Sequence, residues 1–184
     1  MNKSCSLPFL AMLFAMQIVW ADSKSLSQQR EPMSLGQSIQ QAPLWLSQTV
    51  YPDGLGLPTG SGTAQQGLQI FNKQCVSCHG EAGRGGSGGQ LTGPILPKEL
   101  WAKSPRPSKH TGQYWPYATT LFDYIRRAMP YQAPGSLTDN EVYALTAYLL
   151  AQQKIITDDF ILNVQTLPKV VMPNKDGFIR NSAR

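Results

Sequence analysis

Cys75, Cys78 and His79 stand together in the stretch CVSCH and are the residues of this chain best suited to chemistry. Cysteines at this spacing serve in zinc sites and in dithiols that exchange with a disulfide. When a histidine follows directly, they also serve in the covalent attachment of a c-type haem. Each use needs different surroundings, so the rest of the sequence must decide between them.

Zinc is the weaker interpretation because it needs four ligands. After residue 21 the chain offers only one further imidazole or thiolate donor, His110, and the adjacent Cys78 and His79 would share one small ion awkwardly. A thioredoxin-like dithiol belongs beside a βαβ unit, which the sequence does not predict. Haem attachment explains the spacing, since cysteines three apart on a helical turn face the same way and can reach two vinyl groups of a porphyrin. His79 then places its imidazole under the iron.

The iron of such a group takes a second axial ligand or keeps an open face. Met129 follows a predicted helix and precedes the cap of the next one, so its loop can fold over the haem while both helices stay packed. Met172 lies in a tail, where filling the core is the usual role of a methionine. We expect His110, on a loop rich in proline and lysine, to face solvent or contact a propionate, with ligation as the weaker alternative. Met129 is the predicted partner of His79.

A helix that leads into CVSCH is predicted to begin at Thr63, because Thr63 and Gln66 have the spacing of a capping box. The stretch from 80 to 93 is rich in glycine and has no apolar stripe to bury, which predicts a loop. Both features place the cysteine and histidine side chains at a helix end.

Two further helices are expected beyond the glycine-rich loop. The run WPYATTLFDYIRRAM, residues 115–129, has Pro116 in its first turn and Pro130 after its end. The run SLTDNEVYALTAYLLAQ, residues 136–152, has a capping box at Thr138 and Glu141 and one apolar stripe. No convincing alternation of period two occurs between residues 61 and 153, so the core is predicted to be all-α.

The chain divides by composition into four parts. Residues 1–21 read as an export signal, with a short apolar run after Lys3, and cleavage is expected after Ala21. An uncleaved anchor is the weaker alternative because a spanning helix needs about 20 apolar residues, and no membrane span is expected in the mature chain. Residues 22–60 form a predicted N-terminal arm, residues 61–153 the helical domain, and residues 154–184 a tail that covers its own domain or docks on a partner.

The net charge of +5 is mild, and the lysines and arginines are scattered. Together with export, this pattern argues against nucleic acid as a partner and favours an acidic protein surface. One stretch is locally basic, and we interpret it as a solvated face or a surface that steers a partner. It holds Lys98, Lys103, Arg106, Lys109, Arg126 and Arg127 against Glu99 and Asp123.

CVSCH, the preceding helix with Gly67 and Phe71, the stretch TGPIL, Met129 before Pro130 and the final AYLLA together resemble class I cytochrome c over residues 61–153. The resemblance implies an all-α fold of three to four helices around one covalently bound haem c. It also implies that Gly67 and Phe71 lie where the first helix crosses the last.

Three more residues receive roles from this resemblance. Pro94 would offer its carbonyl to the Nδ1 hydrogen of His79, which would set the tautomer of the ligand and raise its basicity. Ile95 and Leu96 would pack against the haem on the same side.

Phrases outside the haem motif are similar to the cytochrome subunits of sulfur and sulfite dehydrogenases, including the haem domain of the Sox sulfur dehydrogenase. They are VYPDGLGLPTGSGTAQQG, the run from Gly112 to Ala151, and VVMPNKDGF. Because the chain has a single Cys-x-x-Cys-His, a single-haem relative that serves a molybdenum-type sulfite dehydrogenase is expected rather than the Sox subunit itself.

The resemblance implies a periplasmic electron carrier without catalysis of its own. It would take electrons from a sulfite or sulfur dehydrogenase and pass them to a downstream cytochrome or an oxidase. Two alternatives stay open. One is a haem enzyme with an open or labile sixth site, either thiosulfate-oxidising or peroxidase-like. The other is an electron acceptor of an alcohol dehydrogenase.

Overall fold

A computed structural model of the protein describes residues 48–97, 99–100, 103 and 109–178. These residues belong to one of the two units into which the chain divides, Ile39–Arg184. The expected export signal and the arm up to residue 47 lie outside the described residues. In the described part of the arm, the Gly54 amide donates to the Tyr51 carbonyl at 3.0 Å and closes a turn.

The first helix, α2 (Ala64–Gln74), begins as predicted. Thr63 caps it by accepting from the Gln66 amide, and the Gln66 side chain accepts from the Thr63 amide at 3.0 Å, which completes the capping box. Cys75 ends α2 and leads into the short helix α3 (Val76–His79). The 3-10 helix η2 (Glu81–Gly83) follows within the glycine-rich loop. The three residues of CVSCH suited to chemistry therefore lie at the junction of α2 and α3.

Helices α5 (Thr111–Tyr114) and α6 (Ala118–Ala128) come next. Pro116 was expected in the first turn of this second long helix, but it precedes the helix, because Tyr117 keeps an extended backbone and forms the cap. The far end agrees with the sequence: α6 stops at Ala128, and Met129 has an extended backbone before Pro130. Met129 is thereby turned out of the helix.

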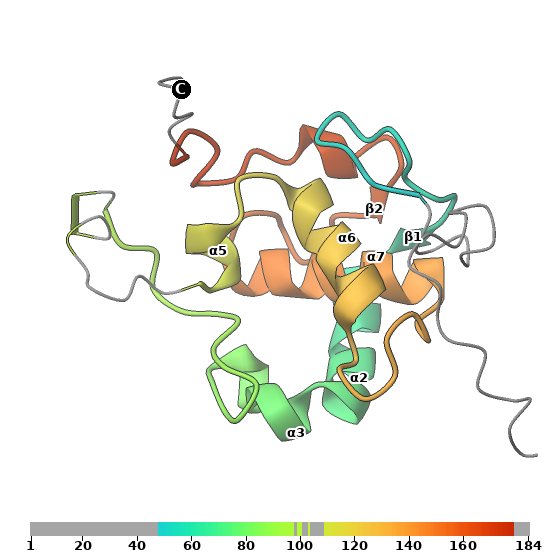
Figure 1. The fold of residues 1–184 in the computed structure, drawn as a ribbon, viewed down its shortest axis with the longest axis horizontal. Coiled ribbons are helices and arrows are strands. Elements are labelled where there is room, and N and C mark those ends of the chain that lie inside the picture. The colour runs from blue at the N-terminus through green and yellow to red at the C-terminus, as the bar shows by residue number, and fades with distance from the viewer. Residues whose placement is uncertain (1–47, 98, 101–102, 104–108, 179–184) are drawn as a thin grey trace, which may run out of the picture. The chain divides into compact units, whose positions relative to one another are not determined.

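Helix α7 (Asp139–Gln152) carries the second predicted capping box, between Thr138 and Glu141. A single apolar stripe was expected along it, yet every residue from Val142 to Ala151 is buried. The reason is its central position, since it contacts α2, α5, α6 and both strands (Figure 1). A helix that is covered on all sides has no solvent face to keep polar.

The two short strands β1 (Ser61–Gly62) and β2 (Leu162–Asn163) pair antiparallel, with Ser61 opposite Asn163. They are too short to show an alternating pattern, and the fold is otherwise helical. The tail continues from β2 through the 3-10 helix η3 (Leu167–Lys169). Leu162, Leu167 and Met172 are fully buried in the core, so the described part of the tail covers its own domain.

The crossing of α2 and α7 is very close at Gly67. A Cβ at this position would lie 2.0 Å from the Ala144 carbonyl oxygen. Phe71, one turn further along α2, packs against Tyr148 with ring centroids 5.1 Å apart. The predicted crossing of the first and last helices at Gly67 and Phe71 is confirmed. None of the helices in the described part of the chain is long and apolar enough to cross a membrane.

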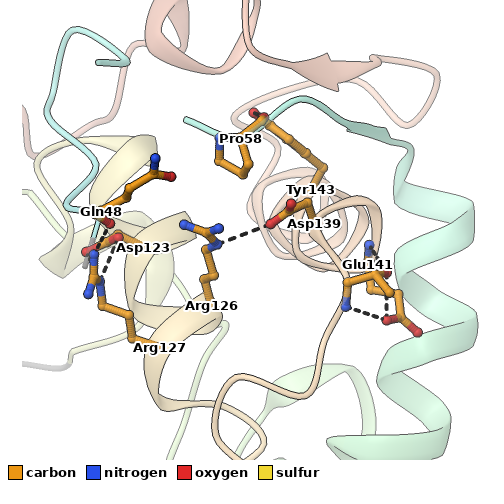
Figure 2. Close-up of polar contacts among 9 residues, drawn as sticks. Gln48, Pro58, Asp123, Arg126, Arg127, Asp139, Glu141 and Tyr143 are labelled. Atoms are coloured by element: carbon orange, nitrogen blue, oxygen red, sulfur yellow. Dashed lines mark hydrogen bonds and ion pairs between the residues drawn. The ribbon is translucent and has the colours of Figure 1, made fainter. Parts of the chain in front are cut away.

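Two arginines of the predicted basic stretch form ion pairs where α6 meets α7 and the arm (Figure 2). Arg126 is only 6% exposed and its Nε donates to Asp139 at 3.1 Å. Arg127 pairs with Asp123 at 2.9 Å and also donates to the Gln48 carbonyl. The expectation of a solvated face is therefore wrong for Arg126, which is buried and paired with Asp139. Lys103 and Lys109 are exposed, whereas Lys98 and Arg106 lie outside the described residues.

Asp139→Asn is expected to lower the free energy of unfolding by about 1–2 kcal/mol, because Arg126 keeps its buried charge and loses its anionic partner. The effect is limited by the side chain of Asp139, which is 39% exposed and partly screened by water. Urea denaturation measures the change. Asp158→Asn, on an exposed turn, is the matched control and should shift stability by less than about 0.5 kcal/mol. Equal effects of the two substitutions would contradict the importance of the ion pair.

Candidate cofactor site

A cavity of about 940 Å³ lies between the α2–α3 junction, α6, α7 and the segment after Met129. Cys75, Cys78, His79 and Met129 all line it, and all four are half-buried. The volume is at the upper end of the range for small-molecule and cofactor sites. Most of the remaining wall is apolar and includes Phe71, Leu91, Leu121, Ile125, Leu145 and Leu149. A second cavity, of about 860 Å³, is formed by the tail and contains none of these candidate residues.

The two cysteines are free thiols in the structure. Burial, and secondarily the charge of Cys78, raises the pKa of Cys75 to about 11. A thiol with this pKa stays protonated at neutral pH, unlike the reactive cysteine of a dithiol–disulfide enzyme, whose pKa is lowered. Within the described ranges, no three His, Cys, Asp or Glu side chains are grouped as a metal ion would require.

His79 is held by the glycine-rich loop. Its Nδ1 lies 2.9 Å from the carbonyl oxygen of Gly89. The loop turns back tightly, with the Gly88 amide donating to the Cys78 carbonyl at 2.8 Å. A Cβ on Gly88 would come within 2.9 Å of the His79 ring, so only glycine lets the backbone lie against the imidazole.

The role expected for Pro94 is therefore wrong. Its carbonyl is 3.1 Å from Nε2 of His110, and Gly89 takes its place beside His79. The loop reaches His79 earlier than expected because its glycines turn the chain back immediately after the helix. The glycine density of the stretch signalled a loop, but a single sequence does not say which carbonyl meets the ring.

Ile95 and Leu96 were expected to pack against the cofactor. They are 43% and 42% exposed and do not line the cavity, so the structure gives no support to this expectation. Gln90 and Leu91 line it in their place. Tyr114 and Trp115 also line the cavity, and the Lys109 ammonium lies 5.7 Å from the centre of the Tyr114 ring.

The structure agrees with the expectation for Met172 but not with the one for His110. His110 was expected to face solvent or to contact a propionate, but it is 1% exposed beneath the loop and does not line the cavity. Its position is fixed by contacts to residues that are distant in sequence. The polar sequence around His110 gave no indication of these contacts. Met172 is 2% exposed within the core, as a core-filling methionine should be.

The pKa of His110 is lowered from its ordinary value because burial disfavours the charged imidazolium. The Pro94 carbonyl and the amides of Gln113 and Gln153 oppose this shift. In the unfolded chain the group titrates near pH 6.5, so just below that pH the unfolded state binds more protons than the folded one. The contribution of His110 to stability is thus present above about pH 6.5 and is lost as the pH falls below it.

His110→Gln should therefore flatten the decline of unfolding free energy between about pH 7 and pH 5, since glutamine does not titrate. Urea denaturation of both proteins across this range measures the slope. An identical slope in the two proteins would show that His110 contributes nothing to the pH dependence.

Comparisons with known proteins indicate the family of the chain. Residues 62–149 match the family model described as cytochrome c oxidase, cbb3-type, subunit III. The crystal structure of the sulfane dehydrogenase SoxCD from Paracoccus pantotrophus contains a chain that is 35% identical, with a TM-score of 0.69, over 82% of this chain and 73% of that one. This protein is a c-type cytochrome.

A curated relative of the cytochrome is the thiosulfate dehydrogenase of Stutzerimonas stutzeri (strain A1501), 31% identical over 104 residues. The match covers 56% of the cytochrome and 32% of that protein, so the cytochrome spans about a third of the length of this relative.

The cytochrome c domain implies binding of haem c, and the residues of the cavity fit this group. Its donor set is a nitrogen, a thioether sulfur and two thiols, which suits an iron porphyrin with covalent links. Gly88 lies against the imidazole where a side chain would clash, and the carbonyl of Gly89 contacts Nδ1 of the same ring. The apolar wall suits the faces of a porphyrin, and Tyr131, which is 81% exposed, marks an edge open to solvent.

Proposed function

We propose that this cytochrome carries one haem c in a class I fold and works as an electron carrier. Cys75 and Cys78 attach the group, and His79 and Met129 bind its iron. One observation carries the proposal: Met129, which follows a different helix, lines the same cavity as the three residues of CVSCH. Tertiary folding thus supplies a thioether donor to the site that already holds an imidazole.

The bound haem supplies reversible one-electron exchange between ferrous and ferric iron. The residues around the haem determine whether a substrate can reach the iron and which oxidation state is favoured. His79 and Met129, as a ligand pair, leave no position for a substrate. The neutral thioether and the apolar wall both favour the ferrous state, which carries less charge. The Gly89 carbonyl orients the imidazole and increases its donor strength.

Electrons would enter and leave at the exposed edge of the cavity. Tyr131 and Gln132 line this part, and the Gln132 amide lies 3.9 Å from the sulfur of Cys78. The exposed Lys109 lines the same cavity and places a positive charge at the site. Such a surface favours a partner with an acidic face, and association with it should weaken as salt screens the charges.

The names of the relatives support a place in sulfur oxidation. We propose that residues 1–21 direct export to the periplasm and that 22–60, 61–153 and 154–184 are arm, cytochrome domain and tail. The electron donor would be a molybdenum-type sulfite or sulfur dehydrogenase subunit, and the acceptor a downstream cytochrome or oxidase. The similarity to a sulfane dehydrogenase complex and to a thiosulfate dehydrogenase supports this choice of donor chemistry.

A second function has some support because one relative is itself named a thiosulfate dehydrogenase. In that alternative the cytochrome oxidises thiosulfate directly at a haem whose sixth ligand is displaced. The two functions differ in a simple mixing experiment. A carrier is reduced by sulfite only when a sulfite dehydrogenase is added, whereas an enzyme is reduced by thiosulfate alone.

Covalent attachment is tested with the cysteines. In protein produced in the periplasm with the haem-attachment machinery, the haem should remain with the wild-type chain after acid-acetone extraction. The double variant Cys75→Ala/Cys78→Ala should release all of it, and each single variant should retain one thioether and a lower haem content. A wild-type chain that loses its haem on extraction, or that contains none, would overturn the proposed attachment.

A further inference from the structure

We propose that His110 is a positioning residue for the iron ligand: it holds the segment Gln90–Leu96 in place so that the Gly89 carbonyl meets Nδ1 of His79. The proposal rests on the proposed function, in which His79 binds the haem iron. His110 itself does not line the cavity, and no contact between His110 and His79 is observed.

The beginning of α5 binds the segment Gln90–Leu96 at three points. The Thr111 amide donates to the Leu91 carbonyl at 2.8 Å. Nε2 of His110 lies 3.1 Å from the Pro94 carbonyl. The Gln113 side chain accepts from the Leu96 amide and donates to the Leu96 carbonyl, both at 3.2 Å. The middle of these contacts is the one made by His110.

The opposite side of the segment is bound to η2. The amides of Leu91 and Thr92 donate to the Gly83 carbonyl at 2.8 and 3.0 Å, and Oγ1 of Thr92 donates to the Ala82 carbonyl at 2.7 Å. The segment is therefore held between η2 and α5. Gly89 comes directly before it, so the position of the Gly89 carbonyl depends on where the segment is held.

The burial of His110 shows that its bond to Pro94 matters. A carbonyl needs a donor, so Nε2 carries the hydrogen and Nδ1 is left as an acceptor. Nδ1 is buried and makes no hydrogen bond of good geometry within the described residues, although the side chains of Gln113 and Gln153 interact with the imidazole. Burying such a nitrogen is unfavourable, and an apolar side chain of similar size would avoid this cost. The bond from Nε2 to the Pro94 carbonyl is the hydrogen bond by which the imidazole holds the segment Gln90–Leu96.

The electronic consequence follows from the hydrogen bond at His79. A carbonyl that accepts from Nδ1–H increases the donor strength of the opposite nitrogen and so stabilises ferric iron. If the segment loosens, the Gly89 carbonyl spends less time at Nδ1, the Nδ1 hydrogen exchanges faster with solvent, and the reduction potential rises.

The test compares three substitutions of His110 in the haem-containing protein. His110→Leu fills the space but has no donor. His110→Asn is polar but too short to reach the Pro94 carbonyl, and it keeps the test possible if the leucine variant does not fold. His110→Gln has an amide that can donate to Pro94. Leu167→Ala, a core substitution in η3 away from the cavity, is the control for a general loss of stability.

Three quantities are measured: exchange of the His79 Nδ1 hydrogen in the ferrous protein by NMR, exchange of the Leu96 amide, and the reduction potential. We expect His110→Leu and His110→Asn to accelerate both exchanges by about three- to tenfold, the effect of losing one hydrogen bond. The potential should rise in both variants, and His110→Gln should restore wild-type values.

Unchanged exchange at His79 in the leucine and asparagine variants overturns the proposal, as does an equal acceleration in Leu167→Ala. Faster exchange at Leu96 without a change at His79 also overturns it, since His110 would then hold the segment without positioning the ligand. A wild-type protein without haem overturns the proposed function instead. The Leu96 amide still reports the contact of His110 in that protein, so the two failures are distinguishable.

Discussion

Met129→Ala is expected to abolish the thioether-to-iron charge-transfer absorption of the ferric cytochrome and to lower its reduction potential by on the order of 0.1 V or more. Axial ligands move haem potentials over a range of about 0.8 V, and a neutral thioether lies toward the upper part of it. Loss of Met129 also opens one coordination position to water and small anions. Absorption spectroscopy, cyanide binding and a redox titration measure these effects.

Met172→Ala is the matched control for this prediction. Met172 is 2% exposed in the core, whereas Met129 lines the cavity. Truncating Met172 should cost about 2–5 kcal/mol of stability and leave the charge-transfer absorption in place. Loss of a ligand should thus remove the charge-transfer absorption, whereas loss of a core residue should lower stability and leave that absorption in place. An unchanged spectrum in Met129→Ala would remove Met129 from the iron and favour an open-site haem enzyme.

Gly67→Ala is expected to destabilise the protein by about 3 kcal/mol or more. The added Cβ would lie 2.0 Å from the Ala144 carbonyl oxygen and 2.7 Å from Cβ of Tyr148, so α2 and α7 would have to move apart. Helix propensity acts in the opposite direction, since alanine in a helix is favoured over glycine by about 1 kcal/mol. Urea denaturation of the haem-containing protein measures the difference.

The exposed Gln69 on the same helix provides the control, because Gln69→Ala changes a side chain that faces solvent. It should shift stability by less than about 0.5 kcal/mol. A neutral or stabilising Gly67→Ala would mean that propensity outweighs the contact and that the two helices have room to separate.

Local interactions made much of the helical frame predictable. The boxes at Thr63–Gln66 and Thr138–Glu141 involve residues three apart, and both form as expected. The end of α6 before Pro130 is likewise set by neighbours in the chain. At Pro116 the local sequence was ambiguous. The predicted start of the helix lay about one turn too early, because the Tyr117 backbone remains extended.

Long-range contacts were beyond a single sequence. Arg126 stands beside a second arginine, and the sequence gave no sign that it is buried against Asp139. The burial of α7 on all sides depends on elements that are distant in sequence, including β1, β2 and α2. The crossing at Gly67 was predicted only through the family resemblance, since a glycine in a helix does not by itself indicate which helix packs against it.

The same distinction between local and long-range contacts applies to the candidate site. The sequence by itself predicted haem attachment at CVSCH, because the spacing of Cys75, Cys78 and His79 is a local property of one helical turn. It also made Met129 the candidate for a second ligand. Only the tertiary structure decided that Gly89 rather than Pro94 meets His79 and that His110 is buried beneath the loop. These contacts depend on how a glycine-rich chain turns back and on which buried donors it finds, and neither is encoded in the spacing of neighbouring residues.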